Sequence, residues 1–124
     1  MRRPLPLVAL ALAALVLLSG CPDDRPPVPA RDGRVGLTLD DFSITPQRVE
    51  ARPGRLSFDV VNRGRAAHNL VVRRGERELE PRLPSLKGGE RGSVSVRVRR
   101  GAYTLACSLA NHEELGASGI LTVR

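Results

Sequence analysis

The sequence predicts an all-β protein, a Greek-key β-sandwich of seven or eight short strands. Beyond residue 35, no stretch of useful length keeps the period of a helix, and short runs alternate apolar with polar residues instead. Gly, Pro and Asn interrupt these runs at the spacing of sandwich turns. The chain has 124 residues, which indicates one small domain, and 41% of them are hydrophobic, which argues against general disorder.

Three short strands are expected first. Residues 35–39 alternate larger apolar side chains with glycine and threonine. Residues 42–45 form a β-prone run that is closed by Pro46, and 48–52 form another that ends in a Pro53-Gly turn.

The clearest strand is 55–62. Leu56, Phe58 and Val60 face one side and the residues between them face the other, which is the period of a half-buried strand. An Asn-Arg-Gly turn then leads to the next expected strand, 69–73.

The last part of the chain holds three more expected strands. Residues 74–92 are polar and glycine-rich with two prolines, so we expect a long connection there. Residues 93–99 alternate valine with polar residues, 102–108 place Cys107 on one face with two other apolar side chains, and 120–123 close the chain. The segment 35–124 is thus the expected domain.

The first 20 residues have the pattern of a signal peptide. Arg2 and Arg3 precede an apolar run, 5–18, whose 14 residues are too few to span a bilayer, which takes about 20. The run ends in Leu-Ser-Gly before Cys21, which resembles the lipobox of bacterial lipoproteins, where this cysteine is acylated. We expect export, removal of residues 1–20 and a lipid anchor that holds the protein at a membrane, facing the periplasm or the cell exterior. The alternative is a secreted protein with Cys21 as a free thiol, a liability in an oxidising compartment.

Residues 21–34 are expected to be the lipidated cysteine and a solvated tether. The stretch from Pro22 has four prolines, and five charges fall between Asp23 and Asp32. Extended, it would lift a domain roughly 40 Å from the membrane. The tether either reaches toward partners or only clears the lipid headgroups.

Three side chains suggest a metal site. If Cys21 is lipidated, Cys107 has no disulfide partner, and the only histidines are His68 and His112. One thiolate and two imidazoles are the equatorial donors of a trigonal copper site, because thiolate suits Cu(I) and imidazole accommodates both oxidation states. The alternatives are a buried inert cysteine, a surface histidine in a loop and a histidine bonded to backbone.

The chain resembles the cupredoxins, the small blue-copper proteins. Two segments carry the resemblance: NRGRAAHNLVV at 62–72 and GAYTLACSLANHEELGASGILTV at 101–123. The resemblance implies that His68, Cys107 and His112 bind one copper ion. It also implies that Asn69 supports the ligand loops by hydrogen bonds.

The axial position departs from the family pattern. Where the cupredoxins commonly have a methionine ligand, five residues after the second histidine, this chain has Ala117, which offers no side-chain ligand. A dry apolar axial position favours Cu(I) and raises the reduction potential, whereas water admitted there lowers it. The backbone carbonyl of Ala67 is a candidate on the opposite side. Glu113 or Glu114 is a candidate oxygen ligand, although adjacent charged loop residues are more often solvated.

The surface suggests a protein partner. In the cupredoxins the second histidine projects through an apolar patch, and alanines and leucines surround His112 in the sequence: Ala66, Ala67, Leu109, Ala110, Leu115 and Ala117. Four arginines are expected to frame it and to steer an acidic redox partner such as a cytochrome or an oxidase domain: Arg63, Arg65, Arg73 and Arg74. The alternatives are a solvated basic surface and attraction to anionic lipid. Nucleic acid is not an expected partner, since the basic residues are not interleaved with aromatics.

The expected function is that of a membrane-anchored type 1 copper protein, a monomer that carries single electrons in an extracytoplasmic redox chain. The sequence holds no catalytic triad, carboxylate pair or phosphate loop, so an enzyme is not expected. The main alternative is an accessory protein that carries copper for oxidase assembly or copper homeostasis without redox turnover. A sensor or enzyme that uses the vacant axial position, and a metal-free assembly module, are further alternatives.

Overall fold

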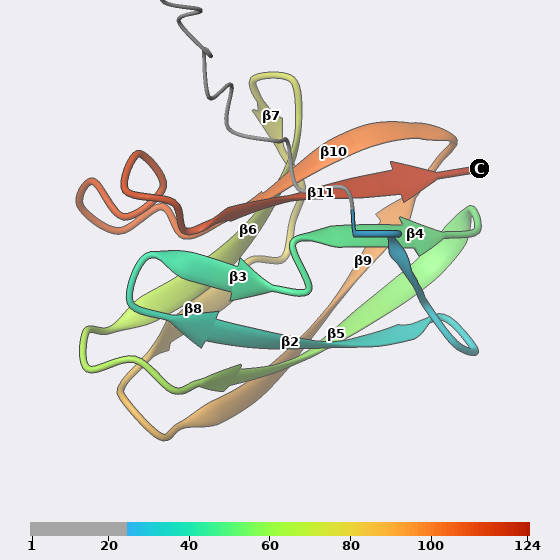
Figure 1. The fold of residues 1–124 in the computed structure, drawn as a ribbon. Coiled ribbons are helices and arrows are strands. Elements are labelled where there is room, and N and C mark those ends of the chain that lie inside the picture. Colours follow the sequence, from blue (N-terminus) through green and yellow to red (C-terminus); the bar gives the residue numbers. More distant parts are fainter. Residues whose placement is uncertain (1–24) are drawn as a thin grey trace, which may run out of the picture.

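The computed structural model describes residues 25–124, and the predicted signal peptide and Cys21 lie outside this part of the chain. Two sheets face each other as a sandwich (Figure 1). The strands are β1 (Val28–Pro29), β2 (Arg34–Asp40), β3 (Ser43–Thr45), β4 (Arg48–Ala51), β5 (Gly54–Asn62), β6 (His68–Arg74), β7 (Arg77–Glu78), β8 (Leu83–Leu86), β9 (Arg91–Val98), β10 (Gly101–Ala106) and β11 (Ser118–Val123). The predicted all-β sandwich is confirmed.

Each sheet contains strands from both halves of the sequence. One sheet runs β1-β4-β11-β10-β6-β7, with β8 also paired to β6, and the other runs β3-β2-β5-β9. β2 pairs with β5 and β4 with β11 in parallel, although most neighbours are antiparallel. Such non-consecutive neighbours are the signature of Greek-key connections.

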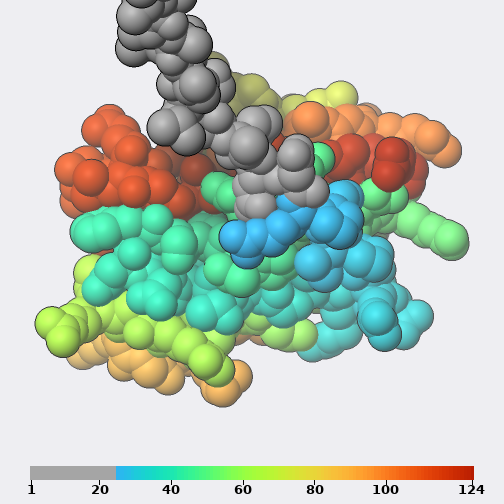
Figure 2. Space-filling model, viewed as in Figure 1, coloured from blue at the N-terminus to red at the C-terminus, as the bar shows by residue number. Residues whose placement is uncertain are grey.

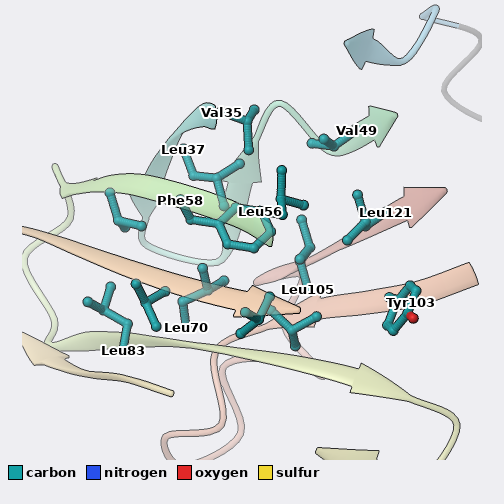
Figure 3. Close-up of a cluster of buried hydrophobic side chains, with 14 of the residues drawn as sticks. Val35, Leu37, Val49, Leu56, Phe58, Leu70, Leu83, Tyr103, Leu105 and Leu121 are labelled. Atoms are coloured by element: carbon teal, nitrogen blue, oxygen red, sulfur yellow. The ribbon is translucent and has the colours of Figure 1, made fainter. Parts of the chain in front are cut away.

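The core lies between the two sheets. Along β5 the inward side chains of Leu56, Phe58 and Val60 are buried in strict alternation, as the sequence predicts. Figure 3 shows Phe58 surrounded by side chains from both sheets, among them Leu105 and Leu121. A tightly packed core of this kind fixes the strands that position the loops at either end.

Two segments differ from the sequence expectation. The predicted connection 74–92 contains β7 and β8, both of which pair with β6, because its scattered apolar residues supply inward anchors such as Leu83. The second half of the predicted tether also joins the fold: β1 pairs in parallel with β4, and the Ala30 amide N–H donates to the carbonyl of Glu50. Figure 2 shows these first described residues, in blue, lying against the body of the domain.

These additions explain why the structure has more strands than the expected seven or eight. The extra elements are short: β1 and β7 have two residues each and β8 has four. Runs of this length carry no measurable alternation, so a periodicity argument does not find them. Among residues 25–124, no helix has the length and hydrophobicity needed to cross a bilayer.

Candidate metal centre

The fold brings His68, Cys107 and His112 together. β6 and β10 are antiparallel neighbours, so the start of β6 at His68 meets the end of β10, and Cys107 follows its last residue. One potential ligand atom from each of the three residues lies within 4.8 Å of the others. Sγ of Cys107 is 3.5 Å from Nδ1 of His112, and the two imidazole centroids are 4.7 Å apart.

His68 has one ring nitrogen engaged and one without a partner. Its Nε2 lies 3.3 Å from Oδ1 of Asp41, while its Nδ1 is buried and makes no hydrogen bond. The side chain is fully buried. A buried polar atom without a partner carries a desolvation penalty, and a metal ion bound to Nδ1 would remove it.

Asp41 ties the loop before β6 to the turn after β2. Its carboxylate accepts hydrogen bonds from the backbone N–H groups of Arg65 and Ala66 as well as facing His68. These contacts hold the pKa of Asp41 below its ordinary value. The hydrogen bond from the Ala66 N–H has the largest effect, the one from the Arg65 N–H the next largest, and the contact with His68 the third. Gly64 permits this approach, since a Cβ there would lie 2.3 Å from the Asp41 carboxylate.

The same loop is held on its inner side by Asn62. This fully buried residue donates from Nδ2 to the carbonyls of Ala66 and Leu86, both at 2.8 Å, and its Oδ1 accepts the N–H of Gly64. Since every polar atom of the side chain is satisfied, the loop that presents His68 is fixed from two sides.

The loop from Cys107 to Ala117 is closed by backbone hydrogen bonds. The N–H of Cys107 donates to the carbonyl of Ala117, and the N–H of Ala117 donates to the carbonyl of His112. Gly116 has a φ of +122°, and a Cβ there would lie 2.6 Å from the carbonyl oxygen of Phe42. Only glycine fits this contact, so the loop is pressed against the turn that carries Asp41.

Asn69 joins the two ligand segments. Its Oδ1 accepts the backbone N–H of Ser108 at 2.8 Å, and its Nδ2 donates to the Ser108 hydroxyl at 2.9 Å. Asn69 is buried and follows His68, while Ser108 follows Cys107. The pair therefore locks the relative position of one histidine and the cysteine.

His112 lies nearest to the surface of the three. Cys107 and His68 are fully buried, whereas His112 is half-buried. Phe42, which is exposed, packs edge-on against the His112 ring with centroids 5.9 Å apart, and Leu115 is also exposed. The apolar contact of His112 that the structure shows thus comes from a distant part of the sequence.

The other expected surface residues differ in their placement. Ala117 is buried, so it does not contribute to an apolar patch at the surface. Arg73 pairs with Glu113, the residue after His112, so it lies at the ligand loop. Arg74 instead lies over the ring of Tyr103, because adjacent strand residues point to opposite faces of a sheet.

The axial candidates are placed as follows. Ala117 is beside the cluster through its hydrogen bonds to Cys107 and His112, and its methyl group offers no donor atom. Ala67 directly precedes β6 and is exposed. Glu113 is paired with Arg73, and the cluster of potential ligands in residues 25–124 includes no glutamate.

Sequence reasoning missed Asp41 and Phe42. Both lie in the turn between β2 and β3, more than 20 residues before His68. Phe42 has a φ of +65°, which is unusual for an aromatic residue. An aromatic residue next to two aspartates in a turn is the one signal that the sequence offered, but it does not reveal which histidine lies opposite.

Comparison with known proteins identifies the fold. No protein-family model matches the chain, and no curated protein matches it in sequence. Three similar solved structures are a reduced auracyanin from Roseiflexus castenholzii, auracyanin A, a "blue" copper protein from Chloroflexus aurantiacus, and a purple cupredoxin from Nitrosopumilus maritimus.

The overlap covers most of each chain. The first has 13% identity and a TM-score of 0.67 over 77% of this chain and 98% of the other. Auracyanin A has 16% identity and a TM-score of 0.65, over 78% of this chain and 100% of the other. The purple cupredoxin has 19% identity and a TM-score of 0.56, over 73% of this chain and 99% of the other. The chain therefore has the β-sandwich fold of the cupredoxins.

Proposed function

We propose that this chain binds one copper ion through His68, Cys107 and His112 and carries single electrons. The observation that supports the proposal most directly is the buried Nδ1 of His68, which has no hydrogen-bond partner in a cluster that also contains a cysteine sulfur and a second imidazole. A thiolate with two imidazoles is a donor set that suits copper in both of its common oxidation states.

The support around the cluster favours a preorganised site. Asp41 orients His68, the Asn69–Ser108 pair joins the two ligand segments, and the backbone of Ala117 closes the loop. Bound copper would supply one-electron chemistry. A frame that keeps its donors in place in both oxidation states keeps the reorganisation small, which is what an electron carrier requires.

The exposure of the ligands suggests where electrons leave. His68 and Cys107 are closed off from solvent, while the half-buried His112 packs against the exposed side chain of Phe42. We propose that a redox protein, such as a cytochrome or an oxidase domain, docks over this edge. Auracyanin A, one of the structural relatives, is itself described as a "blue" copper protein.

The anchor is proposed from the sequence alone. Export, acylation of Cys21 and attachment to a membrane rest on the segment before residue 25. Metabolic labelling with a palmitate analogue tests this: Cys21→Ser should abolish labelling, and Cys107→Ser should retain it. Equal labelling of both variants would contradict the anchor.

The metal site is tested by spectroscopy on the purified full chain. Addition of Cu(II) should give an intense visible thiolate-to-copper charge-transfer band and a narrow copper splitting in the EPR spectrum. Cys107→Ser should lose the band, while Cys21→Ser, a matched cysteine control, should keep it. A correctly folded but colourless wild-type protein would contradict the proposed electron carrier.

Copper delivery is the alternative role, and the absence of a side-chain donor at Ala117 favours it. A delivery protein would surrender Cu(I) readily to a chelator, whereas an electron carrier would hold it and show a reversible reduction potential. The full burial of Cys107 and His68 supports slow release. Measuring the Cu(I) off-rate and the potential on the same preparation separates the two roles.

A further inference from the structure

A basic pocket lies at the end of the sandwich that is opposite to the metal cluster. It has a volume of about 340 Å³ and is lined by Arg74, Arg77, Leu79, Arg97, Arg99 and Tyr103. His68 begins β6 and Arg74 ends it, a separation of about 20 Å along the strand (Figure 1). We propose that this pocket binds a phosphate group.

The four guanidinium groups of the pocket have no acidic partner in the part of the chain that the structure describes. Within residues 25–124, no carboxylate forms an ion pair with Arg74, Arg77, Arg97 or Arg99, although other arginines of the domain are paired. Glu78, the acidic residue of β7, pairs with Arg82 at 3.0 Å. No acidic side chain lines the pocket.

The strand register adds repulsion. Arg74 and Arg77 are directly opposite each other in the β6–β7 pair, and Arg97 is directly opposite Arg55 in the β5–β9 pair. Like charges in these positions destabilise a sheet. A bound anion would reverse this cost, so the arrangement favours a ligand with several negative oxygens.

Tyr103 contacts two of the arginines that line the pocket. Its ring lies under the Arg74 guanidinium, whose Cζ is 5.7 Å from the ring centroid, and its hydroxyl donates to the carbonyl of Arg99 and accepts the Arg99 N–H. Figure 3 shows Tyr103 at the edge of the core, with its oxygen directed away from the cluster. One buried side chain therefore contacts the guanidinium of Arg74 and holds the backbone of Arg99.

Gly101 completes the support. A Cβ at this position, where φ is +143°, would lie 2.9 Å from Nη2 of Arg74. The absence of a side chain at Gly101 leaves room for the Arg74 guanidinium next to the backbone. Because the tyrosine hydroxyl is already used, recognition falls to the guanidinium groups, whose planar forks match the oxygens of a phosphate.

The phosphate has two possible sources, a soluble phosphate compound and the headgroup of an anionic phospholipid. Titration calorimetry of the full chain with sodium pyrophosphate, at constant ionic strength, tests the first. Flotation with phosphatidylglycerol vesicles, against phosphatidylcholine vesicles, tests the second. The apolar leader affects every variant equally, so differences between variants report on the pocket.

The variants separate the pocket from general charge. Arg74→Gln and Arg97→Gln should each weaken pyrophosphate or phosphatidylglycerol binding roughly tenfold. Arg91→Gln removes the same charge at the other end of β9 and should change binding little. Equal losses in all three variants, or no binding by either probe, would overturn the proposal.

A stability measurement checks the same inference without a binding signal. Pyrophosphate should raise the melting temperature of the wild type and of Arg91→Gln, but not of the Arg74→Gln/Arg97→Gln double variant. Arg77→Gln should be at least as stable as the wild type at low salt, because it removes the cross-strand repulsion. A marked loss of stability in Arg77→Gln would contradict the repulsion argument. Neither readout depends on copper, so failure of the metal site leaves this test intact.

Discussion

The carboxylate of Asp41 lies 3.3 Å from Nε2 of His68, which leaves Nδ1 as the nitrogen available to a metal. The same carboxylate accepts the backbone N–H groups of Arg65 and Ala66. One acidic side chain therefore fixes both the imidazole and the loop that carries it. Carboxylate–histidine contacts of this kind also make the histidine a stronger donor to the metal.

Asp41→Ala should weaken copper binding about 10- to 100-fold, since the imidazole loses its orienting partner. Asp41→Asn should have a smaller effect, because an amide oxygen still accepts from the loop. Competition with a Cu(I)-specific chelator measures the affinity. Asp59→Asn, in a surface ion pair with Arg34, is the control and should not change it. An unchanged affinity in Asp41→Ala would refute the positioning role.

Asn69→Ala should destabilise the folded protein by about 1–3 kcal/mol, because it removes two hydrogen bonds and leaves the Ser108 amide without its partner. It should also speed copper release, since the cysteine and histidine segments are no longer joined. Urea unfolding and stopped-flow chelation measure the two effects. Ser108→Ala keeps the backbone bond and should be milder; if it were as severe, the hydroxyl would be the main tie.

Ala117→Met should lower the reduction potential, because a thioether beside the cluster adds a donor that favours Cu(II). Since Ala117 is 1% exposed, the larger side chain should also cost about 1–3 kcal/mol of stability. Ala117→Leu adds similar bulk without a donor and serves as the control. Voltammetry on both variants is decisive: equal potentials would mean that bulk, not ligation, caused the change.

Glu50→Gln should make the stability less dependent on pH in the acid range. A hydrogen bond from Arg124 lowers the pKa of Glu50 from 4.5. A carboxyl whose pKa is lower in the folded state stabilises the protein above its unfolded pKa, and this contribution disappears as the pH falls through the folded value. The wild type should therefore melt above the variant at neutral pH, and the two melting temperatures should approach each other as the pH falls through the folded pKa of Glu50.

High salt at neutral pH should reduce the difference in melting temperature between the wild type and Glu50→Gln, because the Glu50–Arg124 ion pair is exposed and therefore screened. Arg124→Gln should show the same pH and salt behaviour, since it removes the other partner. A difference in melting temperature between Glu50→Gln and the wild type that stayed the same from neutral to acid pH would point to packing, and not to charge, as its cause.

The sequence predicted the sandwich because the inward side chains of its long strands alternate. In β5 that alternation is continuous, so the burial of Leu56, Phe58 and Val60 could be read directly. The parallel pairing of β1 with β4 could not be predicted in this way, since two residues carry no period and Pro29 argues against a strand. The same limit applies to β7 and β8.

The composition of the candidate site was also available in the sequence, since the chain has only two histidines and one cysteine beyond residue 21. Their spacing relative to the C-terminus and the Asn69 that follows His68 indicated which residues to consider. The fold class and the set of donor side chains could therefore be predicted without a structure, because both depend on local pattern and residue chemistry.

The groups that support those donors became visible only in the folded structure. Asp41 and Phe42 reach the site from the β2–β3 turn, and the arginines of the proposed phosphate pocket come from β6, β7, β9 and the turn after β9. Such neighbours are set by how the two sheets pack and how their strands align. No local pattern records contacts between residues far apart in the chain, so they appear only once the chain has folded.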